Sequence, residues 1–231
     1  MNTNNTKNNS EASNSNSAIT VFRKVWRLIR IPLAILIVLF IGLMIYRFPV
    51  VEERIKTQEV VKVIQSQKLT LADVMGENLP PEPDAALKDA TLEGIDVNNN
   101  GIRDDVELAI FKLHPDSARV RAAELQYAMA LQNEMTSNVF NSDTLVVVIQ
   151  EEGRSFSCVA ETVPKVTLQD SNEKWVEQDQ LIKLRIKEIE DLIFNTDVRK
   201  QRRDKIYENY TTTFKELQEP NCDIDLATIS N

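Results

Sequence analysis

The residues whose chemistry and spacing stand out lie in a stretch of twelve, 96–107. Oxygen-bearing side chains occupy its first, third, fifth, ninth and twelfth positions: Asp96, Asn98, Asn100, Asp104 and Glu107. Gly101 occupies the sixth position. Ca²⁺ takes six to eight hard oxygen ligands at about 2.3–2.6 Å, and a glycine permits the sharp turn of a loop whose alternate residues point inward. The spacing therefore favours a calcium-binding loop.

This stretch resembles a single EF-hand-type calcium loop, and more closely the single-loop variants of dockerins and thrombospondin type 3 repeats. The resemblance implies one side-chain oxygen each from Asp96, Asn98 and Asn100, the main-chain carbonyl of Ile102, Asp104 directly or through water, and both oxygens of Glu107. It covers twelve residues and implies nothing about the rest of the chain. Residues 69–107 as a whole are similar to single-span bacterial membrane proteins, a likeness that carries no function with it.

Two departures separate this loop from a paired calcium sensor. Arg103 stands at the eighth position, where such loops usually have an aliphatic residue that pairs with a second loop, and the sequence has no second loop. Residues 90–95 also make a poor incoming helix. Because asparagines lower the ligand charge, we expect a structural Ca²⁺ with a dissociation constant of about 10⁻⁴–10⁻³ M. The alternative is a plain Asn-Gly turn followed by a helix capped by Asp104 and Asp105.

The usual catalytic patterns are missing from the sequence. It has one histidine, His114, which we expect at the surface or capping a helix, and no G-x-S-x-G, H-E-x-x-H or P-loop pattern. The adjacent Glu151 and Glu152 do not converge on one substrate from a single element. We therefore expect an interaction or scaffold module and not an enzyme. The alternatives are an envelope-associated hydrolase and a secretion- or pilus-type accessory subunit.

The two cysteines, Cys158 and Cys222, are 64 residues apart. In an oxidising compartment their disulfide would close a large loop, worth about 3–5 kcal/mol in the chain-entropy model. Two free buried thiols are the alternative. We expect the disulfide.

An apolar segment early in the chain predicts a membrane anchor at residues 23–49. Sixteen residues, 31–46, carry no charge and would span about 24 Å as a helix; the neighbouring apolar residues extend the contact with a lipid bilayer to 28–49. Trp26 and Tyr46 suit the two interfaces, and Pro32 would fall in the first turn. A buried core helix or a cleaved signal peptide is less consistent with the flanking arginines and with the absence of a small-residue cleavage site.

Charge predicts the orientation of the anchor. Residues 1–47 contain six Lys or Arg and one acidic residue, whereas the remainder contains 21 Lys or Arg and 34 Asp or Glu. The basic residues before the span have no acidic neighbours, which favours a cytoplasmic N-terminus in the cell membrane and an extracytoplasmic C-terminal part. The acidic remainder argues against nucleic-acid binding.

Composition divides the rest of the chain. Residues 1–22 are rich in Asn, Ser and Thr, so we expect a disordered cytoplasmic tail. Residues 50–84 read as a helical stalk followed by a Pro-rich linker that ends with Leu79-Pro-Pro-Glu-Pro-Asp84. Residues 85–231 would form the helical domain that carries the loop.

Apolar periodicity predicts an all-α domain. We expect helices over 104–113, 117–136, 172–194 and 197–218, and Asp170-Ser-Asn-Glu173 is typical of a capping box. Residues 144–149 are β-branched and ambiguous, and we favour a helix. The last two helices, separated only by Asn195-Thr196, predict an antiparallel hairpin. A homo-oligomer formed through this pair is an alternative, and the partner protein is not identified by the sequence.

The run Arg199–Lys205 is basic, and we expect it to form a solvated helix face. Contact with an anionic lipid or a protein partner is the alternative.

Overall fold

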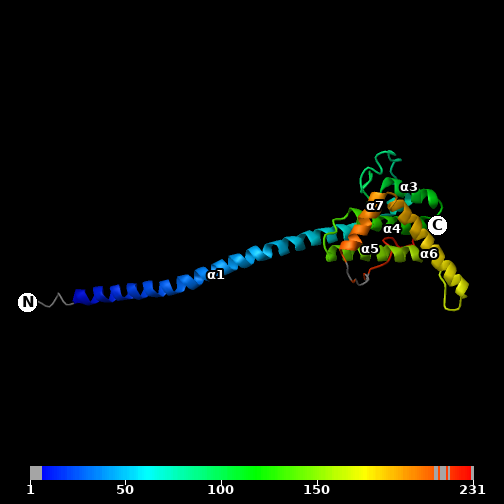
Figure 1. Ribbon diagram of the computed structural model, residues 1–231. Helices are drawn as coiled ribbons and strands as arrows, with labels where there is room; N and C mark the ends of the chain where they lie inside the picture. The colour runs from blue at the N-terminus through cyan, green and yellow to red at the C-terminus, as the bar shows by residue number, and fades with distance from the viewer. Residues whose placement is uncertain (1–6, 211–212, 214–216, 218, 230–231) are drawn as a thin grey trace, which may run out of the picture. The chain divides into compact units, whose positions relative to one another are not determined.

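The computed structural model describes residues 7–210, 213, 217 and 219–229, and for residues 7–22 it describes the main chain alone. The described residues form seven helices and no strand, which confirms the all-α prediction (Figure 1). The helices are α1 (Lys7–Ser66), α2 (Leu71–Met75), α3 (Asp104–Leu113), α4 (Ala118–Thr136), α5 (Ser142–Glu161), α6 (Asn172–Ile193) and α7 (Asp197–Asn209). The chain divides into two compact units, Met1–Lys56 and Thr57–Asn231.

The first unit contains most of α1, which is long and apolar enough to cross a membrane. The apolar side chains of its uncharged stretch are exposed, as a lipid-facing helix requires. Pro32 and Pro49 lie inside the helix, not at its first turn as expected for Pro32. Proline is tolerated inside membrane-spanning helices.

The expectation of a disordered tail over residues 1–22 is not matched where the structure describes it. Residues 7–22 are helical, and residues 1–6 lie outside the described part. Extending a helix that already exists adds one hydrogen bond per residue without the cost of nucleation. That gain offsets the weak helix propensity of Asn, Ser and Thr.

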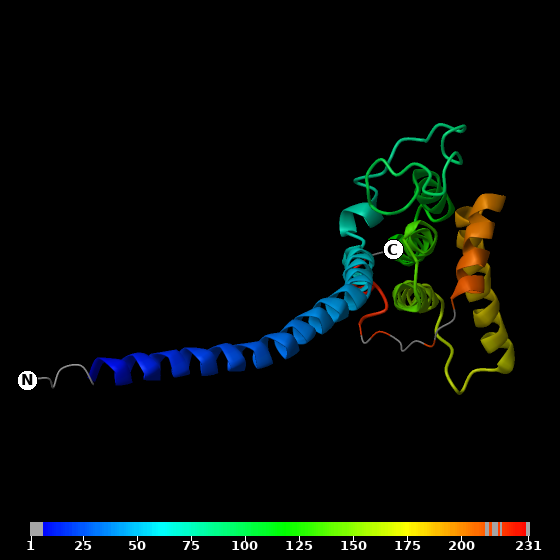
Figure 2. The ribbon, with the colours of Figure 1, turned by 60° about the vertical axis from the view of Figure 1, so that its left-hand side comes forward.

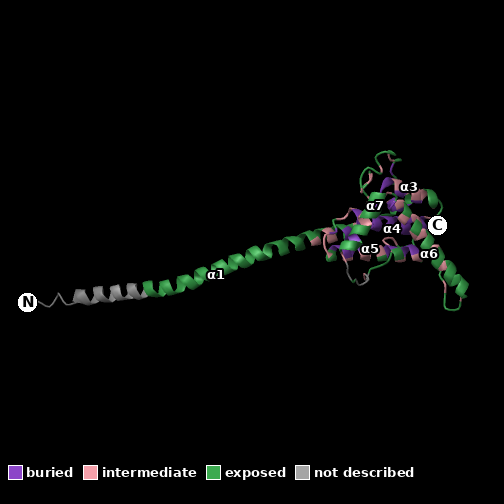
Figure 3. Ribbon diagram, viewed as in Figure 1, coloured by how far each residue is buried: buried purple, intermediate pink, exposed green. Residues whose placement is uncertain are grey.

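In the second unit, α4 is the central helix and is buried on nearly all sides (Figure 3). It packs most extensively against α5, to which it is joined by a short loop, and it also contacts α2, α3, α6 and α7. Figure 2 shows α4 and α5 side by side. Its apolar residues, among them Leu125, Tyr127 and Leu131, form the main core with α3 and the end of α6. Some of its buried polar residues find partners on neighbouring segments: Arg121 donates to the carbonyl of Val74 and Gln126 to that of Asn221.

A second core cluster moves the predicted domain boundary. Ile64, at the end of α1, is buried with Leu145, Val148 and Ile206, and Val60 and Val61 pack against this cluster. Residues 57–66 therefore belong to the helical domain, although they were predicted to be stalk. The apolar residues of this stretch pack against α5 and α7. In the sequence, the polar residues between them concealed this role.

The helices after α4 follow the prediction with one error in length. Residues 144–149 lie in α5, so the helix interpretation of this ambiguous segment is confirmed. Helix α6 ends at Ile193 and α7 begins at Asp197, as expected. However, α7 ends at Asn209, short of the predicted 218, and most of residues 211–218 lie outside the described part of the chain. Phe214 lies outside the described residues.

The helices α6 and α7 do not pack along one another as an antiparallel hairpin. Helix α7 packs on α4, and only the C-terminal part of α6 reaches the core, through Ile189 and Ile193. The predicted capping box is not formed: the side chain of Ser171, the N-cap residue, makes no capping hydrogen bond within the described part of the chain. Asp170 instead accepts hydrogen bonds from Thr167 and binds Lys174.

The predicted disulfide is present. Cys158 of α5 and Cys222 are bonded, and their Cα atoms are 5.0 Å apart. The segment around Cys222 is further held by Arg154, which donates to the carbonyls of Pro220 and Asn221 and pairs with Asp223 at 2.7 Å. Asp223 also accepts a hydrogen bond from the main-chain N–H of Leu69, so this segment links the end of α1 to α5.

Candidate metal site

The twelve-residue loop leads directly into α3. Asp104 and Glu107 lie in the first turn of this helix, where main-chain N–H groups and the helix dipole favour negative charge. Asn99 and Gly101 both have positive φ, 56° and 85°. These two positions turn the chain sharply, which is the role that the sequence assigned to Gly101.

The loop folds around its own side-chain oxygens. The carboxylate of Asp96 accepts the main-chain N–H groups of Asn100 (3.2 Å) and Gly101 (2.9 Å). The amide oxygen of Asn100 accepts the N–H of Ile102 at 2.9 Å, and Asp104 accepts the N–H of Val97 at 3.0 Å. These bonds fold the main chain of the loop around the side chains of Asp96, Asn100 and Asp104.

Two carboxylate oxygens in this turn are buried without a partner. Asp104 and Glu107 are fully buried, and Oδ2 of Asp104 and Oε1 of Glu107 have no hydrogen-bond partner among the described residues. Burial raises the pKa of Glu107 to about 7, an effect that the amide groups of Asn98 and Asn100 oppose. The amide nitrogen of Asn100 is likewise buried without a hydrogen-bond partner among the described residues. Burial also raises the pKa of Asp104, and the neighbouring Asp96 adds to this. A hard cation would satisfy both oxygens and restore their charge.

Other observations limit the fit. Asn98 donates its amide N–H to Glu107 at 3.0 Å, so its nitrogen and not its oxygen faces that carboxylate. Among the described residues, no group of three or more His, Cys, Asp or Glu side chains is placed to hold a metal ion. An ion in this loop would therefore depend on amide and main-chain oxygens as well as on the carboxylates. Of the predicted ligands, Asp96, Asn98, Asn100, Asp104 and Glu107 take part in hydrogen bonds within the loop, and Ile102 donates its main-chain N–H to Asn100.

The structure assigns Arg103 a role that the sequence did not predict. Its guanidinium is fully buried, pairs with Asp105 at 3.0 Å, and donates to the carbonyls of Leu192 and Ile193 at the end of α6. The residue that departs from the EF-hand-type pattern thus docks the loop on α6 instead of pairing it with a second loop. Its unusual type at that position was the only signal in the sequence.

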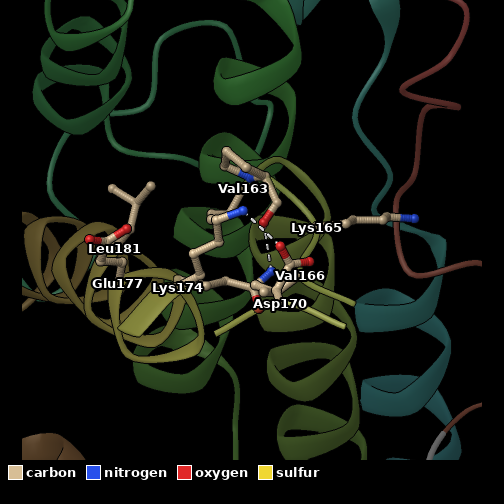
Figure 4. A pocket seen from close by; sticks show the side chains of 9 residues that line it. Val163, Lys165, Val166, Asp170, Lys174, Glu177 and Leu181 are labelled. Carbon is tan, nitrogen blue, oxygen red and sulfur yellow. Dashed lines mark hydrogen bonds and ion pairs between the residues drawn. The ribbon is translucent and has the colours of Figure 1, made fainter. Parts of the chain in front are cut away.

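Two other places have the makings of a site. His114 Nε2 lies 2.9 Å from Oε2 of the buried Glu124. A pocket of about 330 Å³ lies between the loop that precedes α6 and the start of that helix, and Figure 4 shows Lys174 turned toward Asp170 at its edge. Asp170 and Lys174 are paired with each other, and Lys165 and Glu177 are exposed, which leaves little to orient a ligand.

Comparisons with protein-family models, with curated proteins and with solved structures find no match to this chain. The fold and the loop therefore define only a class: an all-α domain that follows a helix able to cross a membrane, with a candidate cation loop at the start of α3.

Proposed function

We propose that this chain is a single-pass membrane protein whose helical part is an extracytoplasmic interaction or scaffold domain, not an enzyme, stabilised by one structural Ca²⁺ in the loop 96–107. Its N-terminus would lie in the cytoplasm. The observation that carries the calcium proposal is the pair of unpartnered oxygens on the buried Asp104 and Glu107. A buried carboxylate without a partner is costly, and a cation is the simplest partner for two of them.

Three features support the extracytoplasmic placement. Basic residues flank the entrance of the apolar stretch without acidic neighbours. The disulfide Cys158–Cys222 persists in oxidising compartments and is rare in reducing ones. A loop with two neutral asparagine ligands suits the millimolar calcium of such compartments.

Thermal unfolding of the full-length chain in detergent tests the calcium proposal. We expect the melting temperature to rise on addition of 5–10 mM Ca²⁺, about fivefold or more above the expected dissociation constant, and to return to its original value with chelator. Glu107→Gln removes a buried carboxylate, so its calcium-free form should be at least as stable as the wild type but should not respond to Ca²⁺.

Glu173→Gln is the matched control, because Glu173 is exposed at the start of α6. It should keep the full response to Ca²⁺. A wild-type melting temperature that does not change with Ca²⁺ would exclude the proposed structural ion.

Labelling with a membrane-impermeant maleimide tests the topology. Single cysteines introduced at Ser10 and at Leu168, whose side chain is 91% exposed, lie on opposite sides of the apolar stretch. In intact cells, Leu168→Cys should be labelled and Ser10→Cys only after lysis. The reverse pattern would place the helical domain in the cytoplasm.

A further inference from the structure

Two buried arginines connect the candidate calcium loop with the junction between α6 and α7. Arg103, within the loop, donates at 2.9 Å to the carbonyls of both Leu192 and Ile193. These carbonyls belong to the last turn of α6, where helix carbonyls have no partner inside the helix. The loop therefore caps α6.

The second arginine reaches in the opposite direction. Arg199 of α7 is 1% exposed and pairs with Asp89 at 2.6 Å. It also donates to the carbonyls of Lys88, Thr91 and Leu92, in the segment that leads into the loop. The chain on both sides of Asp96 is thus fastened to the α6–α7 junction.

Gly94 makes room for this arrangement. Its φ is +69°, and a Cβ atom there would collide with the side chain of Arg103. The segment that leads into the loop therefore lies in direct contact with the side chain of Arg103, so a displacement of this segment would disturb the guanidinium.

We infer that occupation of the loop by Ca²⁺ is coupled through Arg103 to the docking of the α6–α7 junction, so that the ion controls how firmly α7 is held on α4. The inference rests on the calcium site of the proposed function and adds its regulatory consequence.

The physical basis is the position of Arg103 between two predicted ligands. The carbonyl of Ile102 and the carboxylate of Asp104 flank it directly in the chain. An ion that binds both fixes the main chain of Arg103 and keeps its guanidinium under α6. Without the ion, Asp104 is repelled by Asp96 and by Glu107, the loop loosens, and the cap on α6 weakens. By linkage, loss of the Arg103 contacts must weaken calcium binding by the same factor.

Hydrogen exchange of the full-length chain in detergent, with Ca²⁺ or with chelator, measures the first half of this coupling. We expect Ca²⁺ to slow exchange of amides in residues 189–209 by about fivefold or more, the lower end of typical coupling factors. Amides of α5, which has no contact with the loop through these arginines, should change less.

Calcium titration by calorimetry measures the second half. Arg103→Met should raise the calcium dissociation constant by about fivefold or more, although its side chain is not a predicted ligand. Arg154→Met is the matched control: Arg154 is also buried and donates to two carbonyls, but it holds the segment around Cys222. It should bind Ca²⁺ as the wild type does.

The outcomes separate the coupling from the site. Calcium binding with unchanged exchange in residues 189–209 would overturn the coupling and leave the calcium site in place. Absence of calcium binding to the wild type would overturn both. If Arg103→Met does not fold, the exchange result on the wild type decides alone.

Discussion

The buried carboxyl of Glu124, in α4, lies beside the half-buried imidazole of His114 at the end of α3. Burial raises the pKa of Glu124 to about 8, and burial together with Arg185 and Arg121 lowers the pKa of His114 below its ordinary 6.5. Burial therefore favours the uncharged form of both groups, and His114 Nε2 lies 2.9 Å from Oε2 of Glu124. His114 is the C-cap residue of α3, in line with the predicted capping position, but nothing in the sequence pointed to Glu124 as its neighbour.

We expect the free energy of unfolding to fall as the pH rises from 6.5 to 8. The folded chain holds the Glu124 proton up to about pH 8, whereas the unfolded chain releases it near 4.5; the contribution is fully present below 4.5 and is lost as the pH rises through 8. The lowered pKa of His114 has the opposite effect, because it makes the free energy of unfolding rise with pH, but only below about pH 6.5. Denaturant unfolding at several pH values should show that, between pH 6.5 and 8, the free energy of unfolding of Glu124→Gln falls by about 2 kcal/mol less than that of the wild type.

The exposed Glu173→Gln should leave this pH profile unchanged. Identical profiles for the wild type and Glu124→Gln would mean that Glu124 is ionised in the folded chain.

The basic run in α7 shows how burial changes the meaning of a charge pattern. Residues 199–205 were predicted to be a solvated face, yet Arg199 is buried and Arg202 donates to the carbonyls of Met135 and Ser137. Arg203 stacks on Phe194 and pairs with three glutamates from α4, α5 and α6. The acidic partners lie far away in the sequence, so local spacing could not predict these contacts.

Arg199→Met should lower the free energy of unfolding by about 3–5 kcal/mol, because Asp89 and three carbonyls lose a buried donor. Lys200→Met, at the next and exposed position of the same helix, should change it by less than about 0.5 kcal/mol. Denaturant unfolding compares the two variants. Equal effects would show that the buried contacts of Arg199 do not stabilise the fold.

At the scale of elements, the sequence predicted the position of a helix correctly where a strong local signal, such as an N-cap residue, marked its start. The N-cap Ser117 and the apolar stripe placed α4 within one residue, and Asp197 begins α7 as expected. Packing directions were not predictable in the same way. Apolar stripes on α6 and α7 are equally consistent with packing on each other or on a third helix, and the central α4 provides the larger apolar surface.

Two serine N-caps provide a matched test of local capping. The side chain of Ser117 accepts a hydrogen bond from the N–H of Val120, whereas Ser171 makes no such bond in the described structure. Ser117→Ala should therefore destabilise the domain by about 1 kcal/mol and Ser171→Ala by a few tenths at most. Thermal or denaturant unfolding distinguishes them, and an equal cost at both sites would contradict the assigned caps.

At the scale of the whole molecule, the apolar helix and the disulfide were the most predictable features. Sixteen uncharged residues and two widely spaced cysteines are strong signals by themselves. The domain boundary was not predictable, because the apolar residues of 57–66 are buried against α5 and α7, which follow much later in the sequence. The candidate calcium loop was predicted as a pattern, but its docking by Arg103 needed the three-dimensional arrangement.

Reduction of the disulfide should destabilise the helical domain by about 4 kcal/mol, the loop-closure value for a separation of this size. The melting temperature of the wild type should therefore fall with a reductant. The double variant Cys158→Ala and Cys222→Ala should begin lower and show no response. A wild type that is insensitive to complete reduction would mean that the segment after α7 is held by its hydrogen bonds alone.

The same bond has a consequence for chain integrity. Cys158 precedes α6 and α7 and Cys222 follows both, so the two helices lie inside one covalent ring. A protease that cuts once within this ring separates the main chain but not the molecule. A non-reducing gel would show one band where a reducing gel shows two, and the nicked protein would keep α7 tied to the rest of its fold.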